Sequence, residues 1–323
     1  MMVALCFVIS ALVATPKVSA KELGKATEGV AVRKLAEAQV DSRPVLAVQF
    51  IGNKLALLRK GGDVVAWDFI KGELKRILQC NVKSLRGGTF SGDGKLLACI
   101  GASQVVSIWD LFAGKLVAKV TGHGGEIRQM AFSHDGRMLA IACEGCCNME
   151  GDTRIWDARS GRLIRRFKGD AFSVTFLNEC ERVAIGGAKA VAIYDVSDGK
   201  KVKELHVGMK VRGVGYLEKG KLLICVSADG LHAFDVATWR KQGTANLGLV
   251  DAVAFSSNGS LIAIGTYGEV VLFDAEPWRV VGKVSWGTRP VTAIAFSPDG
   301  SKFAFGDASG RVALWMVVSK LKS

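Results

Sequence analysis

The sequence predicts an all-β protein, a single seven-bladed β-propeller whose blades are four-stranded antiparallel sheets. The main observation is a three-residue tag with a central aromatic residue, usually followed by Asp, that occurs seven times. Its aromatic residues are Trp67, Trp109, Trp156, Tyr194, Phe234, Phe273 and Trp315. They are separated by 42, 47, 38, 40, 39 and 42 residues, and periods in this range are typical of propellers and solenoids.

The residues around each tag supply the second observation. Most tags follow a strand-turn-strand pattern such as AFSHDGRMLAIA (131–142) or AFSPDGSKFAFG (295–306), in which an Asp-Gly pair suits a tight hairpin because Gly tolerates positive φ. Several tags then continue as D-x-x-x-G before a basic strand, as in Asp157 to Gly161. Each repeat is therefore expected to form four strands, named a to d, with the tag ending strand c.

The third observation concerns the last blade. The seventh repeat supplies strand a (291–296), a strand b and a strand c, but it lacks a fourth strand. The segment AVRKLAEAQ (31–39) has the same mixture of basic and apolar residues as the d strands. We expect it to be the outer strand of blade seven, which would leave no open sheet edge there.

Composition agrees with one compact domain over residues 21–323, because 49% of the 323 residues are hydrophobic and Gly is frequent. The first twenty residues form a separate segment. MVALCFVISALVA is a short apolar run, and Val18-Ser19-Ala20 supplies small residues for cleavage. This predicts a signal peptide (1–20) and a secreted or periplasmic protein. The alternatives are a cytoplasmic protein, or one anchored by an uncleaved N-terminal segment.

These repeats resemble the WD-repeat family of seven-bladed β-propellers over roughly residues 32–317. Four tags keep Trp, and Gly122-His123 keeps the Gly-His of the family. The resemblance implies a buried network in which a His, a Ser or Thr, a turn Asp and the tag Trp form hydrogen bonds. Most copies lack the Asp six residues before the aromatic residue, and blade three comes nearest, with His123, Glu150 and Trp156. We therefore expect a divergent member in which His123 and the tag residues Trp67, Trp109, Trp156 and Trp315 are structural.

The first candidate site lies near the beginning of the innermost strands. When the a strands are aligned on their closing aromatic residue, the position four residues earlier is occupied by Leu46, Arg86, Arg128, Phe172, Arg212, Asp251 and Thr292. Family members commonly bind partners on this channel face. Arginines there, with Lys210, suit carboxylates or phosphates, and Glu126 and Trp286 would add acidic and aromatic contacts. The alternative is that the arginines simply pair with neighbouring acids such as Asp251.

The second candidate site is a cysteine group in the lengthened b-c loop of blade three. Cys143, Cys146 and Cys147 lie in the repeat whose spacing is 47 residues. In an exported protein, a disulfide within this loop is the leading interpretation. A zinc site that includes His123 has an acceptable ligand set, and reduced thiols without a metal are the third alternative.

No motif predicts catalysis or a cofactor. None of the four histidines lies in a nucleophile-elbow or metalloprotease motif, and no glycine-rich phosphate loop is present. We therefore expect a non-catalytic, monomeric scaffold that binds a macromolecular partner. The alternative is a propeller enzyme or small-ligand sensor that uses the central channel.

The net charge of +13 favours an acidic protein partner, or an anionic envelope component or membrane surface. Part of this charge lies on the d strands, where cations block edge-to-edge pairing. Nucleic acid is disfavoured as a partner because the sequence has no recognition motif or aromatic stacking platform.

Overall fold

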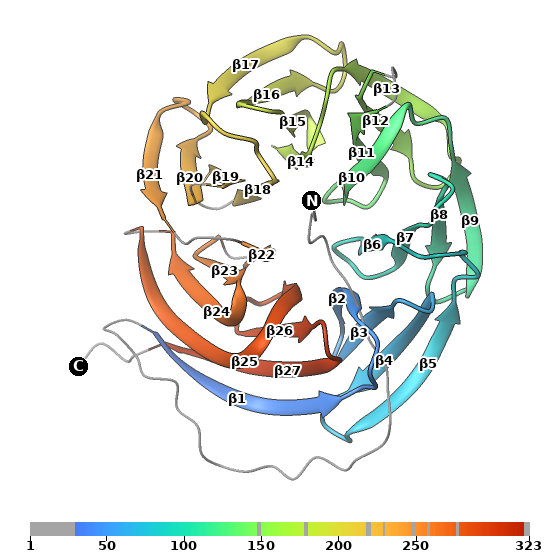
Figure 1. Ribbon diagram of the computed structural model, residues 1–323, viewed down its shortest axis with the longest axis vertical. Coiled ribbons are helices and arrows are strands. Elements are labelled where there is room, and N and C mark those ends of the chain that lie inside the picture. Colours follow the sequence, from blue (N-terminus) through green and yellow to red (C-terminus); the bar gives the residue numbers. More distant parts are fainter. Residues whose placement is uncertain are drawn as a thin grey trace. The chain divides into compact units, whose positions relative to one another are not determined.

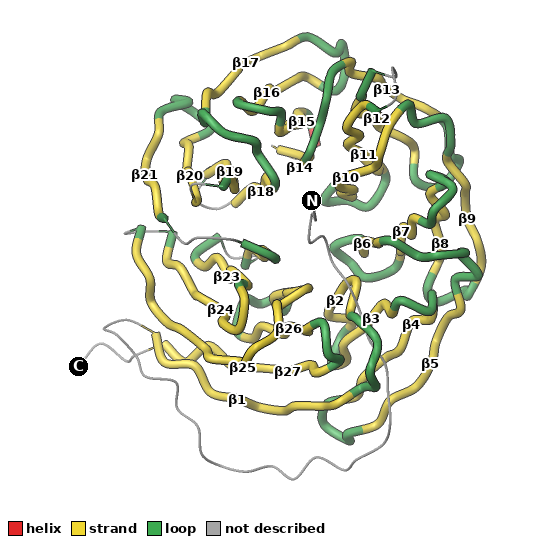
Figure 2. The backbone as a smooth tube through the Cα atoms, viewed as in Figure 1, coloured by secondary structure: helices red, strands yellow, loops and turns green. Residues whose placement is uncertain are grey.

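The computed structural model describes residues 30–146, 150–177, 180–217, 221–228, 230–246, 250–256, 259–275 and 278–319. The expected signal peptide lies outside these residues. The described chain consists of β-strands, turns and loops and has no α-helix (Figures 1 and 2). Accordingly, these residues include no helix that could cross a membrane. The strands belong to two compact units, one formed by residues 82–249 and the other by the segments on either side.

The unit of residues 82–249 contains four separate sheets, each of four strands in sequence order. We number them blades 2 to 5 after the order of their tags, and their strands are labelled in Figure 1. Blade 2 consists of β6 (Gly87–Phe90), β7 (Leu96–Ile100), β8 (Val106–Asp110) and β9 (Lys115–Val120). Blade 3 consists of β10 (Gly125–Phe132), β11 (Met138–Gly145), β12 (Asp152–Asp157) and β13 (Leu163–Lys168). Blade 4 consists of β14 (Ser173–Leu177), β15 (Arg182–Gly186), β16 (Ala190–Asp195) and β17 (Lys201–His206), and blade 5 of β18 (Gly213–Leu217), β19 (Leu222–Ser227), β20 (Gly230–Asp235) and β21 (Lys241–Ala245).

The other unit contains blades 1, 6 and 7. Blade 1 consists of β2 (Val45–Ile51), β3 (Lys54–Arg59), β4 (Asp63–Asp68) and β5 (Glu73–Gln79). Blades 6 and 7 are built from β22 (Ala252–Phe255), β23 (Leu261–Gly265), β24 (Tyr267–Asp274), β25 (Arg279–Phe296), β26 (Lys302–Asp307), β27 (Arg311–Ser319) and β1 (Val30–Gln39). They form one seven-stranded sheet because β25 runs on without a break, pairing with β24 through its first part and with β26 through its last.

The expected closure of blade 7 is confirmed. Strand β1 pairs antiparallel with β27 along its whole length, from Val30 opposite Ser319 to Gln39 opposite Arg311. Arg311 also donates hydrogen bonds from Nε and Nη2 to Glu37 Oε1, at 3.2 and 3.0 Å. Residues from the beginning and the end of the described chain therefore complete one sheet.

The tags end the c strands of blades 1 to 6, as the repeat pattern predicts. The Asp that closes each tag organises the following turn. Asp157 Oδ1, for example, accepts the backbone N–H groups of Arg159 and Ser160 at 3.1 and 2.7 Å, and Gly161 closes the turn at φ +67°. These bonds favour the ionised carboxylate, and together they lower the pKa of Asp157.

Apolar side chains fill the space between neighbouring blades of each unit. Ile108 of blade 2, for example, belongs to the same buried cluster as Leu139 of blade 3. Blades 3 and 4 share a second cluster, and blades 4 and 5 share a third. At Gly186 of blade 4, an added Cβ would clash with Ser173 Oγ of the same blade and would lie 2.9 Å from Val211, which precedes blade 5. Packing between blades therefore stabilises each unit, as expected for a divergent repeat.

Candidate functional site

The candidate partner-binding residues of blades 2 to 5 converge at the beginning of their a strands. Arg86 immediately precedes β6, Arg128 lies in β10, Phe172 immediately precedes β14, and Lys210 and Arg212 precede β18. These strands are labelled near the centre of the view in Figure 1. The common register of the a strands thus brings residues from four repeats to one end of this unit.

Three of these cations and two glutamates form a connected chain of ion pairs, here called the ionic network: Arg86, Glu126, Arg128, Glu144 and Lys210. Arg86 pairs with Glu126, and Glu126 Oε2 lies 2.9 Å from Arg128 Nη2. Arg128 Nε donates to Glu144 Oε2 at 2.6 Å, and Lys210 Nζ lies 3.2 Å from Glu144 Oε1. The network therefore links blades 2 and 3 to the segment ahead of blade 5.

The end of the ionic network rests on an aromatic ring. Lys210 Nζ lies 3.6 Å from the ring centroid of Phe172, within the range of a cation–π contact. Phe172 itself is buried, so it supports Lys210 and offers little surface of its own. Phe172 therefore contributes to the site by contacting Lys210, and its own ring is little exposed.

The ionic network has more positive than negative charge. Together with Arg212 it has four cationic and two acidic side chains, which leaves a net charge of +2. Arg212 is exposed and makes no ion pair within the described part of the chain. Arg86 and Lys210 keep 40% of their side-chain surface exposed, whereas Arg128 keeps only 19% because it lies between the two glutamates.

The arginines do pair with acids, but the acids are Glu126 and Glu144. Sequence reasoning named Glu126 and missed Glu144, which lies near the end of β11 beside Cys143. Asp251 belongs to the other compact unit, where burial raises the pKa of its carboxyl above the ordinary value.

Trp286 also lies in the other unit, and only 4% of it is exposed. Its Nε1 donates to Asp307 Oδ2 at 2.7 Å, and the Arg311 guanidinium lies 3.9 Å from its ring centroid. These contacts hold Trp286, in the part of β25 that pairs with β24, against the end of β26 and the beginning of β27. We therefore do not include it in the proposed binding surface.

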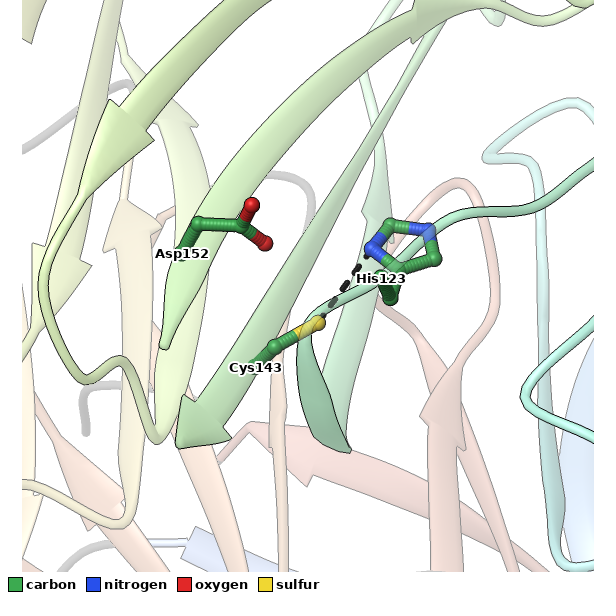
Figure 3. A group of neighbouring side chains, drawn as sticks. All are labelled: His123, Cys143 and Asp152. Atoms are coloured by element: carbon green, nitrogen blue, oxygen red, sulfur yellow. Dashed lines mark hydrogen bonds between the residues drawn. The ribbon is translucent and has the colours of Figure 1, made fainter. Parts of the chain in front are cut away.

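A second group of chemically capable side chains lies inside blade 3, and Figure 3 shows its three members. His123 precedes β10, Cys143 lies near the end of β11, and Asp152 is the first residue of β12. Cys143 Sγ is 3.3 Å from His123 Nδ1. One ligand atom from each residue lies within 4.8 Å of the other two.

Asp152 is fully buried, and its two oxygens have different surroundings. Oδ2 accepts hydrogen bonds from Arg154 Nε at 2.8 Å and from Arg166 Nε at 2.7 Å. Oδ1 is buried and has no hydrogen-bond partner among the described residues, as is also true of His123 Nε2. Since a buried polar atom without a partner costs free energy, these two atoms need an explanation.

The electrostatics of this group disfavour nucleophilic catalysis. Burial, with a smaller effect from the Asp152 carboxylate, raises the pKa of Cys143 to about 12, so its thiol is protonated near neutral pH. Burial, with a smaller effect from the positive charge of Arg154, lowers the pKa of His123 to about 4, so this imidazole is neutral. A buried thiol without thiolate character is a poor nucleophile, although a bound metal ion can displace its proton.

The interpretation of Glu150 as the network acid of blade 3 is wrong. Glu150 is exposed and approaches Lys168 at 3.7 Å, while Asp152 occupies the interior. A usable signal was present, because Asp63 and Asp152 both stand four residues before a tag Trp. Both are buried at the first residue of a c strand. The search for an Asp six residues before the aromatic residue missed them.

The loop cysteines occupy different environments. Cys143 is buried and Cys146 is exposed, and neither takes part in a disulfide within the described chain. Cys147 lies outside the described residues. The leading disulfide interpretation is therefore not supported for Cys143, whose thiol instead faces His123.

The tag tryptophans act through packing. Trp67, Trp156 and Trp315 are buried, and Trp156 contacts the ring of His123 edge to face at 5.8 Å. The indole Nε1 atoms of Trp109, Trp156 and Trp315 have no hydrogen-bond partner among the described residues. The structural role expected of these residues is thus one of apolar contact more than of hydrogen bonding.

A pocket of about 430 Å³ lies between blades 3 and 4. Its wall includes Phe167 and Tyr194, whose rings are 4.6 Å apart, together with Lys168, Lys189 and Glu204. It is lined mainly by the c and d strands and the loops beside them, including Asp170 shortly before β14. It does not coincide with the channel position expected for a small ligand.

The blades and tags define the class of protein that this chain resembles: it has the repeated four-stranded blades and the tags of WD-repeat β-propellers. The WD domain, G-beta repeat, family matches residues 114–157 and 280–316. The first range reaches the tag of blade 3, and the second covers strands of blades 6 and 7.

The chain is similar to two named proteins. The chain is 25% identical over 129 residues, or 39% of its length, to the serine-threonine kinase receptor-associated protein of Gallus gallus. It is 27% identical over 190 residues, or 56% of its length, to telomerase protein component 1 of Rattus norvegicus. The matches span 37% and 7% of those two proteins, respectively.

Proposed function

We propose that this chain is a non-catalytic scaffold that binds an acidic segment of a protein partner through the ionic network and Arg212. WD-repeat proteins generally act as protein-interaction scaffolds, which supports the coarser part of this proposal. The observation that carries the finer part is the convergence of Arg86, Arg128, Lys210 and Arg212 at the beginnings of three a strands of one unit. Among the described residues, two glutamates pair with these cations.

The binding mechanism follows from how firmly these side chains are held. Glu126 and Glu144 fix Arg128 between them, and Phe172 supports Lys210. Side chains that are already ordered lose less conformational entropy when a partner binds. Arg86, Lys210 and Arg212 keep exposed donors, so carboxylates of a partner can pair with them without breaking the network. The rigid blades thus supply the preorganisation, and the three cations supply the attraction.

The test compares two triple variants of the full chain. Arg86→Ala, Lys210→Ala and Arg212→Ala together remove the exposed cations and leave Arg128 between its glutamates. The control removes three exposed cations from outer d strands, at Lys115, Lys119 and Lys203. We measure binding of a fluorescent glutamate-rich peptide at several salt concentrations, followed by crosslinking and recovery of native partners.

We expect the first variant to weaken peptide binding by about tenfold or more and to reduce its salt dependence, while the control changes little. Equal losses in both variants would show that only overall charge matters, and this would overturn the proposed site. Unchanged binding and unchanged partner recovery in the first variant would overturn it as well.

We further propose that the protein is exported. The apolar run at 2–14 and the small residues Val18, Ser19 and Ala20 support this localisation. Mass spectrometry of the purified protein should find Lys21 as the first residue. A mature protein that begins at Met1 or Met2 would contradict cleavage and favour a retained N-terminal segment.

A further inference from the structure

The group His123, Cys143 and Asp152 offers three different donor atoms around one point inside blade 3 (Figure 3). An imidazole nitrogen, a sulfur and a carboxylate oxygen are the three protein ligand types that zinc uses. Calcium and magnesium prefer oxygen alone. The donor set therefore selects a borderline or soft transition metal over a hard cation.

The spacing is close to what a tetrahedral ion requires. Zinc bonds of about 2.0–2.1 Å to nitrogen and 2.3 Å to sulfur place ligand atoms about 3.3–3.8 Å apart. The Sγ of Cys143 and the Nδ1 of His123 are already 3.3 Å apart, and no pair in the group exceeds 4.8 Å. The widest pair would close by about 1 Å to reach this range.

Asp152 has a buried oxygen without a hydrogen-bond partner in the described part of the chain, and this oxygen is able to bind a cation. Asp152 is completely buried, Arg154 and Arg166 occupy its Oδ2, and Oδ1 is left without a hydrogen bond among the described residues. Metal-binding carboxylates are commonly held in this way, with one oxygen oriented by outer hydrogen bonds and the other facing the ion. The two arginines thus orient the donor and leave its ligand position available.

Blade 1 places a different residue opposite the corresponding carboxylate, although Asp63 Oδ1 also lacks a hydrogen-bond partner among the described residues. Asp63 is the counterpart of Asp152, and Arg59 stands opposite it, one residue beyond the Leu58–Val64 pair of the sheet. Arg59 forms a buried ion pair with Asp63. In blade 3 the residue opposite Asp152 is Cys143. On one side of the Asp152 carboxylate blade 3 thus has a thiol and an imidazole, while Arg154 and Arg166 bind its Oδ2.

We propose that His123, Cys143 and Asp152 bind one zinc ion as a structural site. The ion would tie the segment ahead of β10 to the end of β11 and the beginning of β12. A water molecule would complete the tetrahedron. Glu144, which anchors Arg128 and Lys210, follows Cys143 directly in the chain, so the site also fixes one residue of the ionic network.

The test uses the untagged full-length protein, stripped with a chelator and then dialysed against zinc sulfate. We expect one zinc per chain in the wild type, measured by elemental analysis, and loss of that equivalent in Cys143→Ser, His123→Gln and Asp152→Asn. Cys225→Ser is the matched control, because it removes another buried b-strand thiol in the same unit. It should keep the zinc, as should Cys146→Ser.

X-ray absorption of the zinc-loaded wild type keeps the proposal falsifiable even if a variant fails to fold. We expect one sulfur ligand and three nitrogen or oxygen ligands. Two or more sulfur ligands, or loss of zinc in Cys146→Ser with retention in Asp152→Asn, would assign the metal to the cysteine loop instead. A wild type that retains no zinc after dialysis would also overturn the proposal. Zinc binding is scored separately from peptide binding, so this result does not depend on the proposed function.

Discussion

Replacing Asp307 by Ala should destabilise the unit that contains blade 7 more than the loss of an ordinary turn residue would. Asp307 is fully buried and serves two groups at once. Its Oδ2 accepts the Trp286 indole N–H at 2.7 Å. Its Oδ1 accepts the backbone N–H groups of Ser309 and Arg311 at 2.7 and 3.2 Å, and the Ser309 hydroxyl at 2.8 Å.

The magnitude follows from what each group loses. The Trp286 N–H is buried and cannot turn to water, so leaving it unpaired costs about 1–3 kcal/mol. The turn amides are partly accessible, and each of their hydrogen bonds contributes about 0.5–1.5 kcal/mol. We therefore expect Asp307→Ala to lower the free energy of unfolding by about 3–5 kcal/mol. Asp307→Asn keeps one acceptor oxygen, which serves either Trp286 or the turn, and should cost roughly half as much.

Urea unfolding monitored by far-ultraviolet circular dichroism measures both variants. A double-mutant cycle with Trp286→Phe isolates the indole bond, and the coupling free energy should be about 1–3 kcal/mol. Asp198→Ala, in an exposed turn of the other unit, is the control and should change stability by less than about 0.5 kcal/mol. A loss below about 1 kcal/mol in Asp307→Ala, or no coupling to Trp286, would refute the assigned role of this carboxylate.

Three further predictions concern the closing strand, the packing between blades and the turn carboxylates. Deletion of residues 30–39 should lower the melting temperature markedly because β27 loses its partner strand, whereas an equal melting temperature would contradict the importance of closure. Gly186→Ala should cost about 1–3 kcal/mol in urea unfolding through overpacking against Ser173, while Gly213→Ala, whose added Cβ would find its nearest atom at 3.4 Å, should cost less. Hydrogen bonds from Ser297 and Ser301 hold the pKa of Asp299 well below its ordinary value. Its stabilising contribution is therefore complete above the unfolded-state pKa of about 3.9 and is lost as the pH falls below it. Asp299→Asn should flatten the decline of unfolding free energy in this acid range, and an unchanged profile would count against it.

The architecture could be predicted from the sequence because each blade is a local unit. Turn pairs, tags and apolar strands recur within about 40 residues, and they specify the four strands of a blade without long-range information. Even the closing strand could be predicted, since blade 7 lacks a strand and residues 31–39 have the right character. The continuous β25 could not, because Arg289-Pro290 suggests a loop and Pro usually interrupts a strand. Here Pro290 stands opposite Tyr267 where the two blades join.

The candidate sites were predicted less completely because they depend on side chains from different repeats. The alignment of a strands identified Arg86, Arg128 and Arg212, which share a register. It could not identify Glu144, whose pairing with Arg128 and Lys210 depends on how the end of β11 lies beside its neighbours. Asp152 was missed for a different reason, because the family spacing directed the search to Glu150. Its recurrence at Asp63, with the same spacing from a tag, was the better guide.

During synthesis, β1 can pair with β27 only after nearly all of the described chain has been made. Glu37 and Arg311, which form an ion pair in the finished blade, are separated by 274 residues. At a typical synthesis rate of 5–20 residues per second, about 15–55 s pass before β1 can meet its partner. During that interval the β1 segment has no partner strand, and unpaired strand edges favour aggregation. The Arg33 and Lys34 side chains supply charge that disfavours pairing with other chains, so the same residues that end up on the edge of blade 7 first protect the growing chain.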